Sequence, residues 1–363
     1  MKIFRKEHFG GVLYDTNTLR FALVKKLPKD QTISMHIDKE LPDRKDIIST
    51  PIRVYYELLR KCNLVCKHCF VNSSEKSEYG EPTEFVLKVI NELSNNGVID
   101  LRFTGGEPTL RKDLFKILRY AKDKKLSVSL NTNGTFENTH KIANQIAELN
   151  LEQVTVSIDG MRKNHEYMRG VNTFDRTIEA VTLLSERGIH LRINTVITKR
   201  NFFDIPMLIE LASQYAKEIN FFFMRPIGRA VKQNHLSLDF IEHYNSSKNA
   251  LNLRKKYPQL SIMHFEQSFT ERSINSSMKP LKDGYPYGNT TLNLDCFGNI
   301  WPHGYNVYQD SRLNLGNLKN TTLKEVWVKS KKLDNLRNWY AKLINRCKTC
   351  DMYKIKCAGY ILK

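Results

Sequence analysis

The sequence predicts an α/β fold, a partial and open (β/α)6 TIM-like barrel, between about residues 50 and 225. Short runs rich in Val, Ile, Tyr and Phe alternate there with longer segments of helical period, in a β-then-α order that occurs six times. This order indicates a parallel sheet with helices outside it, and six units are too few to close an eight-stranded barrel. We expect the functional site at the carboxyl ends of the strands.

The strands of this core are expected at residues 53–58, 100–103, 127–131, 153–158, 192–197 and 220–224. Apolar residues in two intervening segments recur at the spacing of a one-sided helix: Val86, Val89, Ile90 and Leu93 in the first, and Ile142, Ile146 and Leu149 in the second. These two segments are therefore predicted to pack on the outside of the sheet.

Residues 1–49 precede the barrel and are predicted to form a small β-hairpin element. Its two strands lie within residues 10–24 and are joined by a turn at Asp15-Thr-Asn17. Two strands alone are marginally stable, so the hairpin must pack against the barrel or pair with another element.

Two regions follow the barrel. Residues 226–283 are interpreted as connecting helices and loops. Residues 284–363 are predicted to form a small cysteine-rich domain, with a hairpin at 289–301 that turns at Cys296-Phe-Gly-Asn299 and a helix at about 322–340.

Composition limits the classes of function. The 57 Lys and Arg outnumber the 38 Asp and Glu, for a formal charge of +19, but the basic residues are dispersed. A solvated basic surface therefore explains the charge better than a nucleic-acid partner does. No apolar run approaches the 18 or so residues of a membrane span. Seven cysteines without a secretory signal indicate a reducing cytoplasm.

The most informative motif is the run of Cys62, Cys66 and Cys69, a C-x3-C-x2-C pattern directly after the first barrel strand. Three thiolates gathered in one loop leave one iron of a four-iron cluster without a protein ligand, and chemistry can occur at that iron. The alternative is zinc, which would need a fourth ligand such as His68 within the same loop. An odd number of cysteines disfavours a disulfide framework.

This loop, together with Gly105-Gly106-Glu107-Pro108 after the second strand, resembles the radical S-adenosylmethionine (SAM) superfamily over roughly 175 residues of β/α order. The resemblance implies a [4Fe-4S] cluster on the three cysteines and SAM chelated to the open iron. It also implies reductive cleavage of SAM to a 5′-deoxyadenosyl radical, which abstracts a hydrogen atom from the substrate. A low-potential electron donor such as flavodoxin or ferredoxin is implied as a partner.

The resemblance also implies a set of SAM contacts. Gly105, Gly106 and Glu107 would line the SAM amine, since glycines allow close approach, although the same segment also suits a turn that starts a helix. His68 would lie against the adenine. The remaining candidates follow later strands: Asn133, Ser157, Arg169 as a bidentate partner of the SAM carboxylate, and Asn194 in the fifth strand. Polar residues at strand ends are also ordinary loop initiators.

The C-terminal segment from Gly298 to His303, followed by Cys347-Lys-Thr-Cys350 and Cys357, resembles the SPASM/twitch extension. This extension holds one or two auxiliary iron–sulfur clusters in peptide-modifying members. The pattern is degenerate here, because His303 stands at a usual cysteine position and other cysteines are missing. The expectation is one auxiliary [4Fe-4S] cluster, whose candidate ligands are Cys296, Cys347, Cys350 and Cys357, with His303 as a possible replacement and a zinc or decayed site as the alternative.

Taken together, these motifs predict a cytoplasmic radical SAM enzyme that modifies a peptide or protein by hydrogen-atom abstraction. The N-terminal strands resemble leader-binding elements that accept a peptide by β-augmentation, and a packing hairpin is the other interpretation. The alternative function is a small-molecule enzyme of cofactor biosynthesis, similar to the molybdopterin precursor synthase. Nucleic-acid modification is less favoured, and neither the substrate nor the bond formed can be derived from the sequence.

Overall fold

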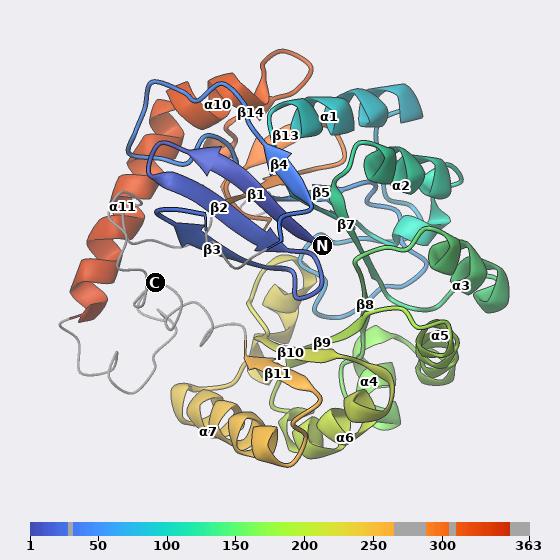
Figure 1. Cartoon of the computed structure of the whole chain (residues 1–363). Helices are drawn as coiled ribbons and strands as arrows, with labels where there is room; N and C mark the ends of the chain where they lie inside the picture. Colours follow the sequence, from blue (N-terminus) through green and yellow to red (C-terminus); the bar gives the residue numbers. More distant parts are fainter. Residues whose placement is uncertain (28–31, 265–287, 305–309, 349–363) are drawn as a thin grey trace.

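The computed structural model describes residues 1–27, 32–264, 288–304 and 310–348. Its main sheet has ten strands in the order β11-β10-β9-β8-β7-β6-β5-β12-β13-β14 (Figure 1). The six expected barrel strands are confirmed as β5 Arg53–Glu57, β6 Asp100–Thr104, β7 Ser127–Thr132, β8 Gln153–Ser157, β9 Leu191–Ile197 and β10 Glu218–Phe223. All of them pair in parallel, so their carboxyl ends meet at one edge of the sheet.

The sheet extends beyond the six expected strands on both sides. The strand β11, Ser261–His264, adds in parallel to β10, and β12, Thr291–Leu294, adds in parallel to β5. The expected hairpin at 289–301 is present as β12 and β13, Asn299–Trp301, and β14, Gly316–Asn317, completes this side. The hairpin therefore belongs to the main sheet.

Helices cover the outer face of the sheet (Figure 1). They are α1 Thr83–Asn95, α2 Leu114–Asp123, α3 Thr139–Glu148, α5 Phe174–Glu186, α6 Ile205–Tyr215 and α7 Phe240–Asn252. The remaining helical segments are α4 Arg162–Arg169 and the short 3-10 segments η1 Pro108–Leu110, η2 Phe202–Asp204, η3 Gly228–Leu236, η4 Leu253–Lys255 and η5 Ser311–Leu313. The predicted apolar stripe of α1 is buried, as expected for a helix that packs on a sheet. In the part of the chain that the structure describes, no helix is long and apolar enough to cross a membrane.

The N-terminal element is larger than the predicted hairpin. The strands β2, Gly10–Asp15, and β3, Arg20–Val24, form that hairpin. In addition, β1, Lys2–Glu7, pairs antiparallel with β2, and β4, Met35–Ile37, pairs parallel with β1. The resulting four-stranded sheet, in the order β3-β2-β1-β4, meets the need for more than two strands.

The N-terminal sheet packs against the amino ends of the barrel strands. The buried guanidinium of Arg5 donates to the carbonyls of Thr50, Pro51 and Gly97, at 2.9, 3.1 and 2.9 Å, just before β5 and β6 begin. The Tyr14 hydroxyl lies 3.1 Å from the Ser127 hydroxyl at the start of β7. These contacts cover the amino end of the barrel and leave the carboxyl end for the site.

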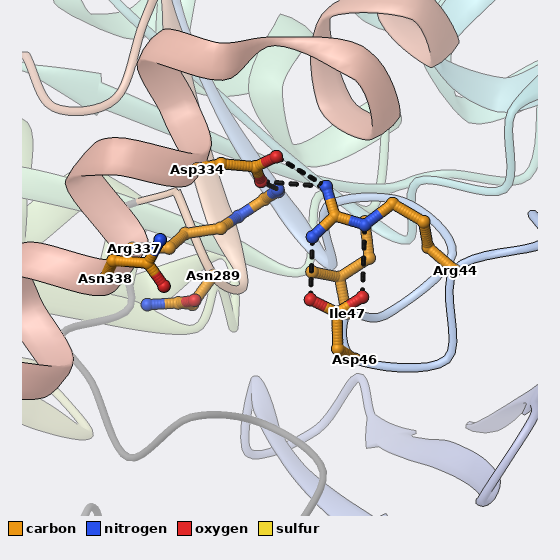
Figure 2. A pocket seen from close by; sticks show the side chains of 7 residues that line it. All are labelled: Arg44, Asp46, Ile47, Asn289, Asp334, Arg337 and Asn338. Carbon is orange, nitrogen blue, oxygen red and sulfur yellow. Dashed lines mark hydrogen bonds and ion pairs between the residues drawn. The ribbon is translucent and has the colours of Figure 1, made fainter.

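The helix expected at about 322–340 is two helices, α10 Leu323–Lys329 and α11 Lys331–Lys348, which are separated because Ser330 has an extended backbone. The segment before β5 holds both of them. Arg44 bonds Asp334 of α11, as Figure 2 shows, and the Trp327 indole donates to the Ile48 carbonyl at 2.8 Å. A small polar pocket lies at this junction, lined by Arg44, Asp46, Ile47, Asn289, Asp334, Arg337 and Asn338.

The Arg5→Met variant is expected to lose about 3–5 kcal/mol of unfolding free energy, because it removes three carbonyl contacts and leaves the buried Glu7 carboxylate without its cation. Urea unfolding measures the change. The neighbouring Lys6→Met variant is the control, since the exposed pair of Lys6 with Asp38 contributes less than about 1 kcal/mol. Equal losses in both variants would contradict the role given to Arg5.

Candidate active site

The cysteine loop leaves the carboxyl end of β5 and closes on itself. The backbone N–H of Cys62 donates to the Ser74 carbonyl at 3.0 Å, and that of Cys69 donates to the Cys66 carbonyl at 3.2 Å. Cys62 and Cys66 are buried, and Cys69, which is partly buried, packs against them and Leu64. The structure thus brings the three predicted ligands together in one apolar cluster at the expected edge of the sheet.

The surroundings of the thiols fit an iron–sulfur cluster. Burial raises the pKa of Cys62 to about 12 and that of Cys66 to about 11, so both thiols are neutral at pH 7 until a metal displaces their protons. The Cys62 sulfur accepts from the Leu64 backbone N–H at 3.4 Å and from the Asn133 side-chain amide at 3.8 Å. The positive charge of Arg169 lowers the pKa of Cys66 against the effect of burial. These donors and this charge favour the thiolates that a cluster requires.

The two glycines allow the cysteine loop to lie directly on the turn after β6. A Cβ atom at Gly105, whose φ is +153°, would lie 2.4 Å from the Leu59 carbonyl oxygen, and one at Gly106 would lie 2.1 Å from that of Lys61. The backbone N–H of Gly106 donates to Leu59 at 2.7 Å. Any side chain at these two positions would push the turn away from the residues that lead into Cys62.

Glu107 is fully buried and its carboxylate accepts hydrogen bonds from the protein. One oxygen accepts from the hydroxyls of Thr109 and Thr132, both at 2.7 Å, and the other accepts from the Asn133 backbone N–H at 2.7 Å. Burial raises the pKa of Glu107 and these donors oppose the change. Glu107 therefore links the turn after β6 to the end of β7 and positions Asn133 beside Cys62. Its predicted contact with the SAM amine stays a prediction.

The sequence interpretation missed Asp159, which follows β8 and connects three parts of the site. Its buried carboxylate bonds the His68 imidazole of the cysteine loop, the Arg169 guanidinium of α4 at 2.6 Å, and the Val196 backbone N–H of β9 at 2.7 Å. Burial alone would raise the pKa of Asp159, but the charges and hydrogen bonds of Arg169 and His68 hold it far below its usual range. The sequence does contain a signal for Asp159, because it is a polar residue directly after the end of a predicted strand.

This network bears on two predicted SAM contacts. The ring of His68, which is expected against the adenine, is oriented by the Asp159 carboxylate. Arg169, which is expected at the SAM carboxylate, donates from its Nε atom to the Asp159 carboxylate as well. Ser157 ends β8 and is the register partner of Asn194 in β9, so these two candidates lie side by side on adjacent strands. The SAM contacts assigned to these residues stay predictions.

A second missed part is η3, which lies inside the segment interpreted as connecting helices and loops. Arg229 donates from its side chain to the Cys66 carbonyl at 2.8 Å and from its backbone to the Cys69 carbonyl at 3.0 Å. The positive φ of Gly228, +59°, allows this contact, because a Cβ atom there would lie 2.5 Å from the Phe70 carbonyl oxygen. The η3 segment thus packs directly on the cysteine loop.

The C-terminal candidates are only partly described. Cys296 is buried in the turn between β12 and β13, next to Gly80, and burial raises its pKa. Burial, with a smaller effect of Arg225, lowers the pKa of His303 to about 3, which leaves a neutral imidazole suited to metal binding. The side chain of Cys347 at the end of α11, and all of Cys350 and Cys357, lie outside the described residues. The auxiliary ligand set stays a prediction.

Two protein families match this chain, one over the barrel and one over the C-terminal region. The family described as the Radical SAM superfamily matches residues 56–212, and SPASM, described as an iron–sulfur cluster-binding domain, matches residues 286–351. The AdoMet-dependent heme synthase of Methanosarcina barkeri is 30% identical, over 86% of this chain and 91% of its own. The mycofactocin maturase MftC of Mycobacterium tuberculosis is 33% identical, over 50% of this chain and 47% of its own.

Solved structures show the same fold. Streptococcus suis SuiB bound to S-adenosylmethionine superposes with a TM-score of 0.75 and 16% identity, over 98% of this chain and 93% of its own. SuiB bound to its precursor peptide SuiA superposes with a TM-score of 0.74 and 16% identity, over 93% of this chain and 90% of its own.

The Asp159→Asn variant is expected to bind SAM about tenfold more weakly, because His68 and Arg169 lose the anion that orients them. Iron content should stay at the wild-type value, since the cysteines are unchanged. Isothermal titration of the reconstituted protein with SAM, together with iron analysis, measures both.

The matched control is Asp175→Asn, which removes an exposed carboxylate paired with Arg162. This variant should bind SAM as the wild type does. Wild-type SAM affinity in Asp159→Asn would contradict the positioning role of Asp159.

Proposed function

The chain belongs to the radical SAM superfamily of enzymes, and from this premise we propose that it modifies a peptide or protein substrate by hydrogen-atom abstraction. When bound, the cluster and SAM supply the reductive cleavage that yields the 5′-deoxyadenosyl radical. The observation that carries the proposal is the convergence of the cysteine loop, the Gly105-Gly106 turn and the Asp159 network at the carboxyl ends of β5 to β9.

The residues of the chain have separate tasks in this proposal. Cys62, Cys66 and Cys69 would hold the cluster, and the Asn133 side-chain amide would stabilise the Cys62 thiolate by donating to its sulfur. The Gly105-Gly106 turn, which excludes side chains, would present its backbone to the methionine end of SAM. Asp159 would keep His68 and Arg169 in place at the opposite side of the loop.

The charge pattern inside the barrel supports a peptide over a polyanionic substrate. Three arginines lie on the inner face of the sheet and bond two carboxylates: Arg53 and Arg102 share Asp100, at 2.6 and 3.1 Å, and Arg192 bonds Glu218 at 2.8 Å. Burial alone would raise the pKa of Glu218, but hydrogen bonds from His190 and Arg192 lower it to about 2, so this pair is ionised at neutral pH. Three arginines thus share two carboxylates on this face, and the single excess positive charge does not match a substrate with many negative charges.

The N-terminal sheet offers a second, weaker support. Its edge strand β3 pairs with β2 on one side, and within the described residues no strand pairs with its other side. An exposed edge of this kind accepts an extended peptide by β-augmentation. Relatives include MftC, named as a maturase, and SuiB, solved with its precursor peptide.

One specific observation favours a second candidate, a tetrapyrrole substrate. The heme synthase of M. barkeri aligns over 86% of this chain, whereas the maturase MftC aligns over 50% of it. A tetrapyrrole with several carboxylates would need several free cations near the site, and all but the one excess arginine charge on the inner face would have to come from elsewhere.

The iron content of the protein tests which cysteines hold the clusters. Anaerobically reconstituted wild type should contain about eight irons per chain, and the triple Cys62/Cys66/Cys69→Ala variant about four, because each cluster holds four. The Cys66→Ala variant alone should form no 5′-deoxyadenosine from SAM with dithionite as reductant. Four irons in the wild type and none in the triple variant would mean that the C-terminal cysteines hold no cluster. SAM cleavage by the Cys66→Ala variant would contradict the assignment of Cys66 as a cluster ligand.

Coexpression and hemin titration distinguish a peptide substrate from a tetrapyrrole. Coexpression with short peptides encoded beside the gene, followed by mass spectrometry, should reveal one peptide whose mass changes only when the enzyme has Cys66. Titration of the purified enzyme with hemin, followed by visible absorption, should give no saturable spectral change. Saturable hemin binding with every peptide unmodified would replace the peptide proposal with the tetrapyrrole candidate.

A further inference from the structure

Two asparagines on neighbouring strands have buried side-chain oxygens that accept no hydrogen bond within the described residues. Asn194 of β9 and Asn220 of β10 are register partners in the parallel sheet. Asn220 is 6% exposed. A buried acceptor without a donor is costly, because it has lost water and gained nothing in exchange. Two such acceptors side by side indicate that another molecule supplies the donors.

Both side chains lie on the face of the sheet that the helices do not cover. Ile193 and Ile197 of β9, and Ile219 and Phe221 of β10, belong to the apolar core shared with the outer helices. Since side chains alternate along a strand, Asn194 and Asn220 project to the opposite, inner face. Their strands run about 4.8 Å apart, which is close enough for both carboxamides to contact one planar group.

The pair is next to the candidate active site. Ser157, the last residue of β8 and a predicted SAM contact, is the register partner of Asn194. Two residues beyond Asn194, the Val196 backbone N–H donates to Asp159. A group bound to the two asparagines would therefore lie inside the barrel, midway along β9 and β10 and beside Ser157.

The adjacent rungs of the sheet indicate what the pair can bind. Towards the amino ends, Arg192 and Glu218 form a rung that is an internal ion pair. Towards the carboxyl ends, Val196 and Phe222 form an apolar rung. The two asparagines and the rungs on either side of them therefore carry no net charge. Each asparagine carboxamide offers both an acceptor oxygen and an N–H donor. This combination complements a neutral amide better than a carboxylate or a phosphate.

We propose that Asn194 and Asn220 form an amide-binding pair, which holds a peptide or carboxamide group of the substrate beside SAM. The proposal rests on the proposed function and names the part of the substrate that these residues recognise. It assigns Asn194 to the substrate, in place of the SAM contact that the family resemblance implies for it. The substrate N–H donates to an asparagine oxygen, and the asparagine NH2 group donates to the substrate carbonyl. The amide N–H satisfies one of the two unpartnered oxygens, or is shared by both, only in the complex, which makes the pair selective for a substrate that carries an amide at this position.

The test uses the reconstituted full chain with 15N-labelled asparagine side chains and two small probes, N-acetylglycine N-methylamide and propionate. The NH2 signals of the pair are identified by their loss in Asn194→Leu and Asn220→Leu, or in the Gln variants if a Leu variant does not fold. The amide probe should shift both signals saturably, and propionate should shift neither. Asn220→Leu should weaken binding of the amide probe at least tenfold.

The matched control is Gln153→Leu, which removes another buried oxygen without a partner, on β8 and at the amino end of that strand. Amide binding should be unchanged in this variant. Asn220→Leu should melt at or above the wild-type temperature, because it removes an unsatisfied buried acceptor.

Absence of a saturable shift with the amide probe, or a stronger shift with propionate, would overturn the proposal. Because the titration needs neither SAM nor turnover, its result is separate from that of the peptide assay. A modified peptide with no amide shift would reject the pair alone, and an amide shift with no modified peptide would reject the proposed function alone.

Discussion

The buried carboxylate of Asp159 is the interaction on which the geometry of the site depends. It is fully buried, and it bonds one residue from each of three separate segments: His68 of the cysteine loop, Arg169 of α4 and Val196 of β9. A buried anion is stable only where its partners are in place, so the Asp159 carboxylate and the positions of the His68 and Arg169 side chains require each other. The nearby Cys66 responds to the same charges, since Arg169 lowers its pKa and Asp159 raises it. The cysteine loop and the barrel are thus electrostatically coupled.

Steric constraints act on the other side of the same loop. The Gly105-Gly106 turn and Gly228 approach backbone carbonyls so closely that a Cβ atom would clash, and together they hold the loop between β6 and η3. Glu107 then links the turn to the end of β7. At the opposite end of the barrel, Arg5 fixes the N-terminal sheet to the segments before β5 and β6. Because that end is covered, substrate access is left to the mouth where the cysteine loop lies.

The six barrel strands could be predicted because each is a compact run of β-branched or aromatic residues bounded by turns, and α1 because its apolar stripe has helical period. The strands β1, β4, β11 and β14 could not, since they are short or polar and owe their structure to partners distant in sequence. The cysteine triad and the Gly-Gly turn were readable as local motifs. Asp159 and Arg229 were not assigned, because their importance comes from contacts with a loop 90 or more residues earlier in the chain. Cys350 and Cys357 lie outside the described residues, and their prediction stands as made.

Some of the places where ordinary rules of folding are broken lie at the candidate site, although buried atoms without partners also occur elsewhere, such as the Gln153 oxygen at the amino end of β8. At the amino end of the barrel, polar groups such as Arg5 and Tyr14 find partners in the protein. At the mouth, thiols are buried with raised pKa values, and midway along β9 and β10 Asn194 and Asn220 keep buried oxygens without donors. Each of these features lowers the stability of the free protein and would be relieved by a bound group, a cluster for the thiols and an amide for the asparagines. Where such costs fall at the candidate site, the fold trades stability for binding, and the nature of each unsatisfied group indicates what it binds.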